Sequence, residues 1–232
     1  MDKIDKIFYI NLTRRPDRKD HFLKSCNNVK IPFDKLERFE GLDGKTYIPT
    51  QIETNMFSNC DFANRLFYNN IVCNQLGHLN LLKEIINRKY NYALICQDDV
   101  YFKNDFIKII NNLLNNIPSN SEIINLGFHS YANGKNFIQW DLTNTPEKDF
   151  NLIGKNKIND FVCELNDIVN PCSLAYIVTF QGAVNLVNYF NKNGFKRATD
   201  RNYNDYCIEK KIFYASIPVL CTGNPDLGSD IF

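Results

Sequence analysis

Two adjacent carboxylates, Asp98 and Asp99, follow a compact apolar run at residues 92–96 that has the length and composition of a buried strand. In open α/β sheets, ligands bind beyond the carboxyl ends of the strands. Adjacent carboxylates repel one another unless water or a cation compensates, and their hard oxygens suit Mg²⁺ or Mn²⁺. The pair therefore indicates a metal site, and a solvated turn with Asp99 capping the next segment is the alternative.

Three arginines, Arg14, Arg15 and Arg18, follow another apolar run at residues 7–12. The guanidinium fork matches phosphate oxygens, and a helix start adds the positive end of its dipole. The alternative is a solvated helix start that is salt-bridged to Asp17 and Asp20, and the residues alone leave both interpretations open. A diphosphate on this loop and a metal on the carboxylates would make one site.

His78 lies within residues 73–88, where leucines recur at three- and four-residue intervals and predict an amphipathic helix. It falls on the apolar side of that helix. A histidine there either is hydrogen-bonded within the core or contacts the substrate directly, and both roles stay open. Gly41 and Gly44 indicate turns.

The elements that must position these residues alternate along the chain. Strands are predicted at residues 7–12, 33–39, 92–96, 123–127 and 174–179, with a short one in the tail 214–232. Helices are predicted from residue 16 to about 26 and at 73–88, 105–116 and 182–190. This alternation predicts an α/β sandwich with a mostly parallel sheet, in a single domain covering 1–232. Segments 45–70 and 130–165 have no clear period, and we expect acceptor-binding loops there.

The composition suits a globular protein, with 44% hydrophobic and 13% aromatic residues. The formal net charge of +1 provides no global field that would attract nucleic acid or an anionic membrane. No signal peptide opens the chain, and no apolar stretch approaches the roughly 20 residues of a membrane span, so we expect a soluble, cytoplasmic protein. The eight cysteines form no CxxC pair and indicate buried free thiols in a reducing compartment.

Several ordered pieces of the chain resemble glycosyltransferase family 25, which includes lipooligosaccharide and collagen hydroxylysine galactosyltransferases. Residues 10–18, INLTRRPDR, resemble the family's opening INLxRRPDR, and residues 92–100, YALICQDDV, resemble YALIxEDDV. Shorter matches are IPF at 31–33, RFEGLDGK at 38–45, LGHL at 76–79, LG at 126–127, AYIV and GA at 175–178 and 182–183, and SD at 229–230. The set spans essentially the whole chain in the family's order.

The resemblance implies a GT-A type fold, a UDP-sugar donor, Mn²⁺ (or Mg²⁺) and inversion at the anomeric carbon, with a glycan or protein hydroxyl as acceptor. It implies a divalent ion on Asp99, helped by Asp98. The donor contacts implied are Asn11, Arg14, Arg15, Arg18, His78, Gln97 and Asp98. A general base is needed near the acceptor hydroxyl, with Asp200 as the first candidate and Asp230 as the second, and Asp205 and Asp226 as further alternatives.

Two positions depart from the family pattern. Gln97 replaces the usual glutamate, which removes one carboxylate, and Gly77 replaces serine, which removes a hydroxyl. The Gln97 departure favours a second hypothesis, a catalytically inactive member that acts as a nucleotide-sugar or glycan-binding module. A third hypothesis, a nucleotidyltransferase on a similar sheet, would need a glycine-rich phosphate loop that the sequence does not show.

Overall fold

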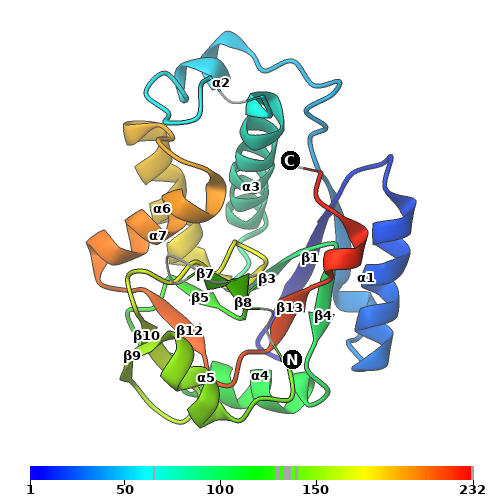
Figure 1. Ribbon diagram of the computed structural model, residues 1–232, viewed down its shortest axis with the longest axis vertical. Helices are drawn as coiled ribbons and strands as arrows, with labels where there is room; N and C mark the ends of the chain where they lie inside the picture. Colours follow the sequence, from blue (N-terminus) through cyan, green and yellow to red (C-terminus); the bar gives the residue numbers. More distant parts are fainter. Residues whose placement is uncertain (65, 129–130, 133–136, 139–140, 231–232) are drawn as a thin grey trace.

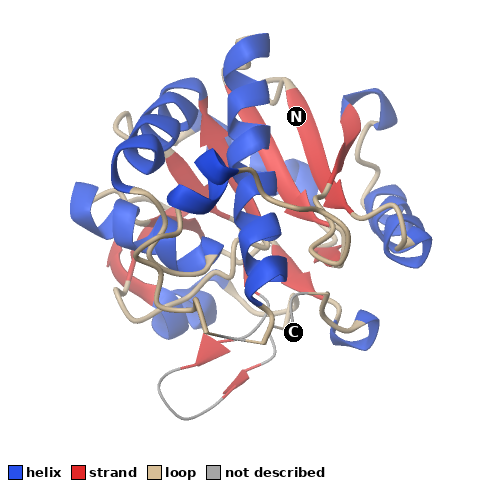
Figure 2. Ribbon diagram, turned by 90° about the horizontal axis from the view of Figure 1, so that it is seen from above, coloured by secondary structure: helices blue, strands red, loops and turns tan. Residues whose placement is uncertain are grey.

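The computed structural model describes residues 1–64, 66–128, 131–132, 137–138 and 141–230, an α/β fold with helices on both faces of a large sheet (Figures 1 and 2). The strands of this sheet are β1 (Lys6–Asn11), β2 (Leu36–Glu40), β3 (Tyr92–Gln97), β5 (Ile123–Asn125), β9 (Gly154–Lys157), β10 (Val162–Leu165), β11 (Ala175–Thr179) and β12 (Tyr214–Ser216). Their order across the sheet is β2-β1-β3-β11-β5-β12-β10-β9.

The sheet is mixed, so the prediction of a mostly parallel sheet is wrong. β1 is parallel to β2 and β3, and β12 is parallel to β5. β11, however, lies antiparallel between β3 and β5, and β10 and β9 add an antiparallel edge. Because β11 runs against β3, its first residue Ala175 pairs with Cys96 near the end of β3. Residues that precede β11 therefore meet residues that follow β1 and β3.

Seven helices are described: α1 (Pro16–Asn28), α2 (Gln51–Asn55), α3 (Tyr68–Arg88), α4 (Phe106–Asn115), α5 (Pro146–Ile153), α6 (Phe180–Asn193) and α7 (Thr199–Lys210). The long helix α3 packs against α6 and α7, and α1 packs against β1. Pro16 suits the start of α1 because its fixed φ is already helical. It lacks a backbone N–H, but the N–H groups of the first helical turn have no acceptor within the helix in any case. Leu76, Leu79 and Leu82 of α3 are buried in the core, as their spacing predicts.

A smaller sheet brings the tail of the chain back to the main one. Its strands are β4 (Val100–Phe102), β6 (Gly127–Phe128) and β13 (Cys221–Gly223), with β13 in the middle, and a separate pair is β7 (Tyr131–Ala132) and β8 (Phe137–Ile138). After β13, a short 3₁₀ turn at Pro225–Leu227 leads the C-terminal segment beside the start of α1 (Figure 1). The C-terminal segment thus meets the loop between β1 and α1.

The predicted elements agree with most of the structure. Residues 33–39 begin as a 3₁₀ turn at Phe33–Lys35 and become the strand β2 only at Leu36. The segments predicted as loops contain α2, α5, β9 and β10. The eight cysteines are free thiols, and six of them are buried.

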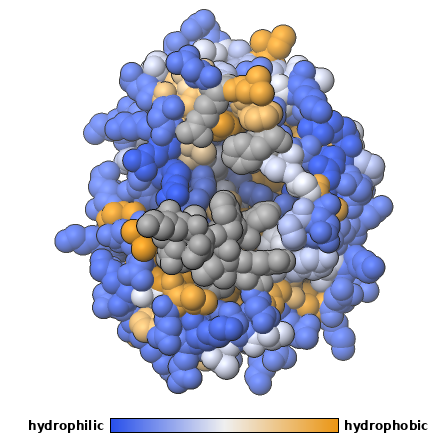
Figure 3. All heavy atoms as spheres, viewed as in Figure 1, coloured by the Kyte–Doolittle hydropathy of each residue, from blue (hydrophilic) through white to orange (hydrophobic). Residues whose placement is uncertain are grey.

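The surface of one face is mostly hydrophilic, with hydrophobic side chains gathered at the end of the molecule that carries α2 (Figure 3). Ile48, Ile52 and Leu66 of this region are strongly exposed. Within the described ranges, no helix has both the length and the apolar composition needed to cross a bilayer.

Candidate functional site

A cavity of about 350 Å³ lies at the edge of the main sheet where β1 and β3 end and β11 begins. Its walls come from the loop after β2, one face of α3, the turn before β11, the start of α7 and the C-terminal segment. The predicted site residues that line it are Arg14, Arg18, His78, Gln97, Asp98, Asp99, Asp200 and Asp230. Asn11 and Arg15 are not among the lining residues but bond to residues that are.

Arg18 holds the two carboxylates at the floor of this cavity. Its Nε lies 2.6 Å from Asp98 Oδ1, and its Nη2 lies 2.8 Å from Asp99 Oδ2. All three side chains are buried, with at most 8% of any of them exposed. The first turn of α1 places Arg18 here, directly beyond the end of the neighbouring strand β1.

Asn11, the last residue of β1, supports the same pair from the side. Its Nδ2 donates to Asp98 Oδ2 at 2.7 Å and to the carbonyl of Arg15 at 3.0 Å. Its Oδ1 accepts from Nε of Arg38 at 2.9 Å, which fixes the amide orientation. Asn11 thus positions Asp98 rather than facing the cavity.

Burial and ion pairing act in opposite directions on these groups. Burial raises the pKa of Asp98, although Arg18 and Asn11 favour its charged form. Burial also opposes the charge of Arg18, but Asp99 and Asp98 outweigh this and raise the pKa of Arg18. The buried ion pairs therefore depend on one another, because removing any partner leaves an uncompensated charge.

A second set of ion pairs ties the C-terminal segment to the arginine loop. Asp230 Oδ1 lies 2.7 Å from Arg14 Nη1, and Asp230 Oδ2 lies 2.5 Å from Arg15 Nη1. Arg14 Nε also pairs with Asp43 Oδ2 at 2.6 Å, and Arg15 pairs with Asp17. The salt-bridged interpretation of this loop is therefore correct for Arg15 and Asp17, and the loop also has two distant partners, Asp43 and Asp230.

His78 is fully buried in the wall of the cavity. Its Nδ1 lies 2.8 Å from the hydroxyl of Tyr176, whose ring stacks on it at 5.9 Å between centroids, and Tyr203 meets it edge-on at 6.0 Å. Burial lowers the pKa of His78 to about 4, so the imidazole is neutral at pH 7. The structure shows the core role that the sequence left open, and because His78 also borders the cavity, its contact with the substrate stays a prediction.

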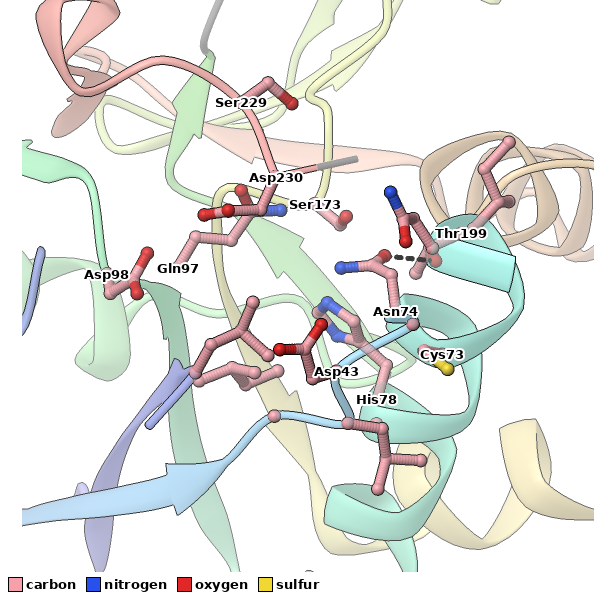
Figure 4. Close-up of a pocket in the computed structure, with 18 of the residues that line it drawn as sticks. Asp43, Cys73, Asn74, His78, Gln97, Asp98, Ser173, Thr199, Ser229 and Asp230 are labelled. Atoms are coloured by element: carbon pink, nitrogen blue, oxygen red, sulfur yellow. Dashed lines mark hydrogen bonds between the residues drawn. The ribbon is translucent and has the colours of Figure 1, made fainter. Parts of the chain in front are cut away.

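Gln97 ends β3 and faces the turn that precedes β11 (Figure 4). Its Nε2 donates to the carbonyl of Cys172 at 3.4 Å. Cys172 and Ser173 both have left-handed backbone conformations, with φ of 59° and 47°. Two successive left-handed residues are uncommon outside glycine, and they turn this segment against the cavity.

Asp200 lies in the first turn of α7, on another wall. Its Oδ2 accepts from Nδ2 of Asn170 at 2.5 Å. The two leading base candidates therefore differ in their partners. Asp200 accepts a hydrogen bond from a neutral amide, whereas both oxygens of Asp230 form ion pairs with arginines.

Asn70, Asn74 and Thr199 also line the cavity but were not singled out from the sequence. Thr199 Oγ1 donates to Asn74 Oδ1 at 2.6 Å, which links α7 to α3 (Figure 4). A sequence signal for the two asparagines did exist. Asn70, Asn74 and His78 are spaced four residues apart and so share one helix face.

A divalent cation fits this conformation poorly. Both oxygens of Asp98 already accept hydrogen bonds, and Arg18 holds Oδ2 of Asp99, so a metal ion would compete with Arg18 and Asn11 for these three oxygens. The described residues contain no group of three histidine, cysteine, aspartate or glutamate side chains arranged for a metal ion. The positive charge beside the carboxylates is an arginine in this structure.

Comparison with known proteins agrees with the geometry. The family model described as "Glycosyltransferase family 25 (LPS biosynthesis protein)" matches residues 4–202. Procollagen galactosyltransferase 2 of Homo sapiens is 26% identical over 196 residues, which is 81% of this chain and 28% of the relative. The Mus musculus protein of that name is 30% identical over 118 residues, covering 49% of this chain and 18% of the relative. "Glycosyltransferase 25 family member" of Drosophila melanogaster is 24% identical over 121 residues, covering 48% and 19%.

This chain therefore spans little more than a quarter of the length of the human relative. The family match includes both strands that end at the cavity, the α3 face and the start of α7. On the residues and the fold together, the chain belongs to glycosyltransferase family 25.

Proposed function

We propose that this protein transfers a hexose from a UDP-sugar to a hydroxyl group of a glycan or protein acceptor. The observation that carries the proposal is the cavity itself, where arginines from the loop after β1 meet polar side chains of α3, β3 and α7. Galactose is the first sugar to test, because the relatives' names include procollagen galactosyltransferase.

Arg14 and Arg15 are the proposed contacts for the donor diphosphate. They pair with Asp230, whose side chain is 20% exposed, and so can exchange this carboxylate for phosphate oxygens. Arg18 would remain in place, because Asp98 and Asp99 hold it from below. Gln97, at the end of β3, would donate and accept hydrogen bonds to the ribose.

Asp200 is the proposed general base for an inverting displacement. The acceptor oxygen would bond to the anomeric carbon as the bond from that carbon to UDP breaks, and UDP would leave with the electron pair. Asp200 would take the proton of the acceptor hydroxyl. The arginines of the loop would stabilise the charge that develops on UDP.

The predicted Mn²⁺ or Mg²⁺ stays a prediction. Such ions often use only one or two carboxylates together with substrate phosphates, and Asp98 and Asp99 would supply these if Arg18 moved away. A bound ion would add a second positive charge for the leaving group. Arg18 offsets part of the charge of this pair, and the steps proposed above involve residues of this chain alone.

The experiment measures UDP release from UDP-galactose, UDP-glucose and their N-acetylated counterparts, with procollagen as the acceptor probe. Each reaction is run with Mn²⁺, with Mg²⁺ and with a chelator. We expect release with at least one sugar and a rise in melting temperature on adding UDP. A protein that neither releases UDP nor is stabilised by any of the nucleotides would overturn the proposal.

Gln97 favours a second candidate function, a module that binds a nucleotide sugar without turnover. In that case the UDP-sugars would raise the melting temperature but no UDP would be released with any acceptor. Restoring the family's residue in Gln97→Glu distinguishes the two functions, because a gain of turnover in this variant would show that only the missing carboxylate prevents catalysis.

A further inference from the structure

Gly77 lies in the middle of α3, where glycine is the least favourable residue other than proline. Close packing explains such a glycine elsewhere in this fold. A Cβ atom added at Gly182 of α6 would lie 2.4 Å from the carbonyl oxygen of Glu122. At Gly77, by contrast, an added Cβ would meet nothing within 4 Å, although the residue is buried and lines the cavity. Gly77 therefore enlarges the cavity and does not serve packing.

His78, the next residue, presents a polar atom at the same wall. Its Nδ1 is engaged by Tyr176, but its buried Nε2 has no hydrogen-bond partner among the described residues. Tyr176 and Tyr203 pack against the ring and prevent it from turning away. A buried nitrogen without a partner is costly, and a ligand atom in the cavity would satisfy it. Because the imidazole is neutral at pH 7, the partner it suits is an uncharged polar group.

Asn74 adds a second polar group one turn earlier on α3. Its Oδ1 accepts from Thr199, which fixes the amide and leaves its nitrogen pointing into the space in front of Gln97 (Figure 4). The two arginines in the cavity wall, Arg14 and Arg18, are both engaged by carboxylates. The α3 wall itself supplies only neutral hydrogen-bonding groups.

We propose that Gly77, His78 and Asn74 form a subsite for an uncharged polar substituent of a sugar ring, a hydroxyl or acetamido group. The space at Gly77 sets the size of the substituent, and His78 and Asn74 bond to it. This subsite rests on the proposed function. The sugar ring belongs either to the donor or to the acceptor, and the experiment separates these sources.

The test compares the wild type with Gly77→Val, in which the side chain fills the space. Dissociation constants are measured for UDP, UDP-galactose and UDP-N-acetylgalactosamine, and KM is measured for the acceptor that supports UDP release. We expect UDP to bind both proteins within about twofold. If the donor sugar occupies the subsite, Gly77→Val weakens the UDP-sugars at least about tenfold, equivalent to about 1.4 kcal/mol. If the acceptor occupies it, only the acceptor KM rises by that factor.

The controls separate the two proposals. A wild-type protein that does not bind UDP or any UDP-sugar overturns the proposed function and the subsite with it. The subsite alone is overturned by a different result. In that case the wild type releases UDP, Gly77→Val is folded, and the two proteins agree within twofold in their dissociation constants for the UDP-sugars and in their KM for the acceptor. Melting temperatures confirm folding, and Gly77→Ala, which also fills part of the space, replaces the valine variant if that variant does not fold.

His78→Gln gives an independent readout of the hydrogen bond. If Nε2 bonds to the substituent, replacing that substituent by hydrogen weakens binding to the wild type but not to His78→Gln. For the donor, UDP-galactose is compared with UDP-2-deoxygalactose. For the acceptor, the substrate that supports UDP release is compared with its deoxy analogues. Equal losses in both proteins, for every deoxy position on donor and acceptor, would show that His78 does not contact the sugar.

Discussion

Arg18 Nε lies 2.6 Å from Asp98 Oδ1, and only 7% of the Arg18 side chain is exposed to solvent. The same guanidinium pairs with Asp99, so one cation is shared by both carboxylates of the family motif. The buried carboxylates therefore depend on this residue, since any ligand that drew Arg18 away would leave two buried negative charges behind.

Replacing Arg18 by methionine should destabilise the fold strongly. We expect Arg18→Met to lower the free energy of unfolding by about 3–5 kcal/mol, because Asp98 and Asp99 lose their buried partner. The control is Arg88→Gln, which removes partly exposed ion pairs to Glu37 and Glu84 and should cost about 0–1 kcal/mol. Urea denaturation measures both, and similar losses for the two variants would contradict the buried pairing.

His78 should make stability fall in mildly acidic solution. Its folded pKa of about 4 lies below the ordinary value of 6.5, so between these pH values the unfolded chain binds a proton that the folded protein does not. Its contribution is complete above pH 6.5 and is lost as the pH falls toward 4, by about 3 kcal/mol in total. His78→Gln should remove this part of the pH dependence. Unfolding free energies of both proteins at pH 7.5 and 4.5 give the comparison, and parallel pH profiles would refute it.

Two helical glycines should respond oppositely to alanine. Gly77→Ala should raise the free energy of unfolding by about 0.5–1 kcal/mol, since the new methyl group meets no neighbour and glycine is a poor helix former. Gly182→Ala should lower it by about 1–3 kcal/mol, because its methyl group would clash with the backbone of Glu122. Thermal and urea denaturation report both changes. A loss at Gly77 would mean that the space beside α3 is smaller than the structure shows.

The two candidate bases should differ in kinetics. Asp200→Asn should lower kcat by about 10²–10⁴-fold, as expected for loss of a general base, with little change in melting temperature. Asp230→Asn should leave kcat within about tenfold. Its effect should fall on the donor, with UDP bound about fivefold more tightly, because a diphosphate no longer competes with a carboxylate for Arg14 and Arg15. A large kcat loss in Asp230→Asn alone would reverse the assignment.

Strand positions could be predicted from the sequence, but their directions could not. The apolar run of β11 looks the same whether it pairs parallel or antiparallel, and only its place between β3 and β5 decides this. The edge strand β9, GKNK, is polar and mostly exposed, so it lacks the pattern that marks a strand. For α2, a signal was present, because Thr50 and Glu53 form a capping box that the spacing alone suggests.

The sequence predicted which residues belong to the candidate site better than it predicted which of them contact one another. The motif matches selected Arg18, Asp98 and Asp99, and the structure brings them together. Nothing in the sequence indicates that residues 80 positions apart form one ion pair, because that contact depends on how α1 and β3 are packed. The sequence could not show, for the same reason, that Asp230 would face the arginine loop.

The contact between the arginine loop and Asp230 has a consequence for how the protein is made. Arg14 and Asp230 are separated by 216 positions, so the ribosome completes the loop long before its partner exists. At about 5–20 residues per second, the interval is roughly 10 to 40 s. Throughout that time the nascent chain lacks one wall of its cavity and the carboxylate that pairs with Arg14 and Arg15. Translation must therefore pass residue 230 before the wall of this cavity can be completed.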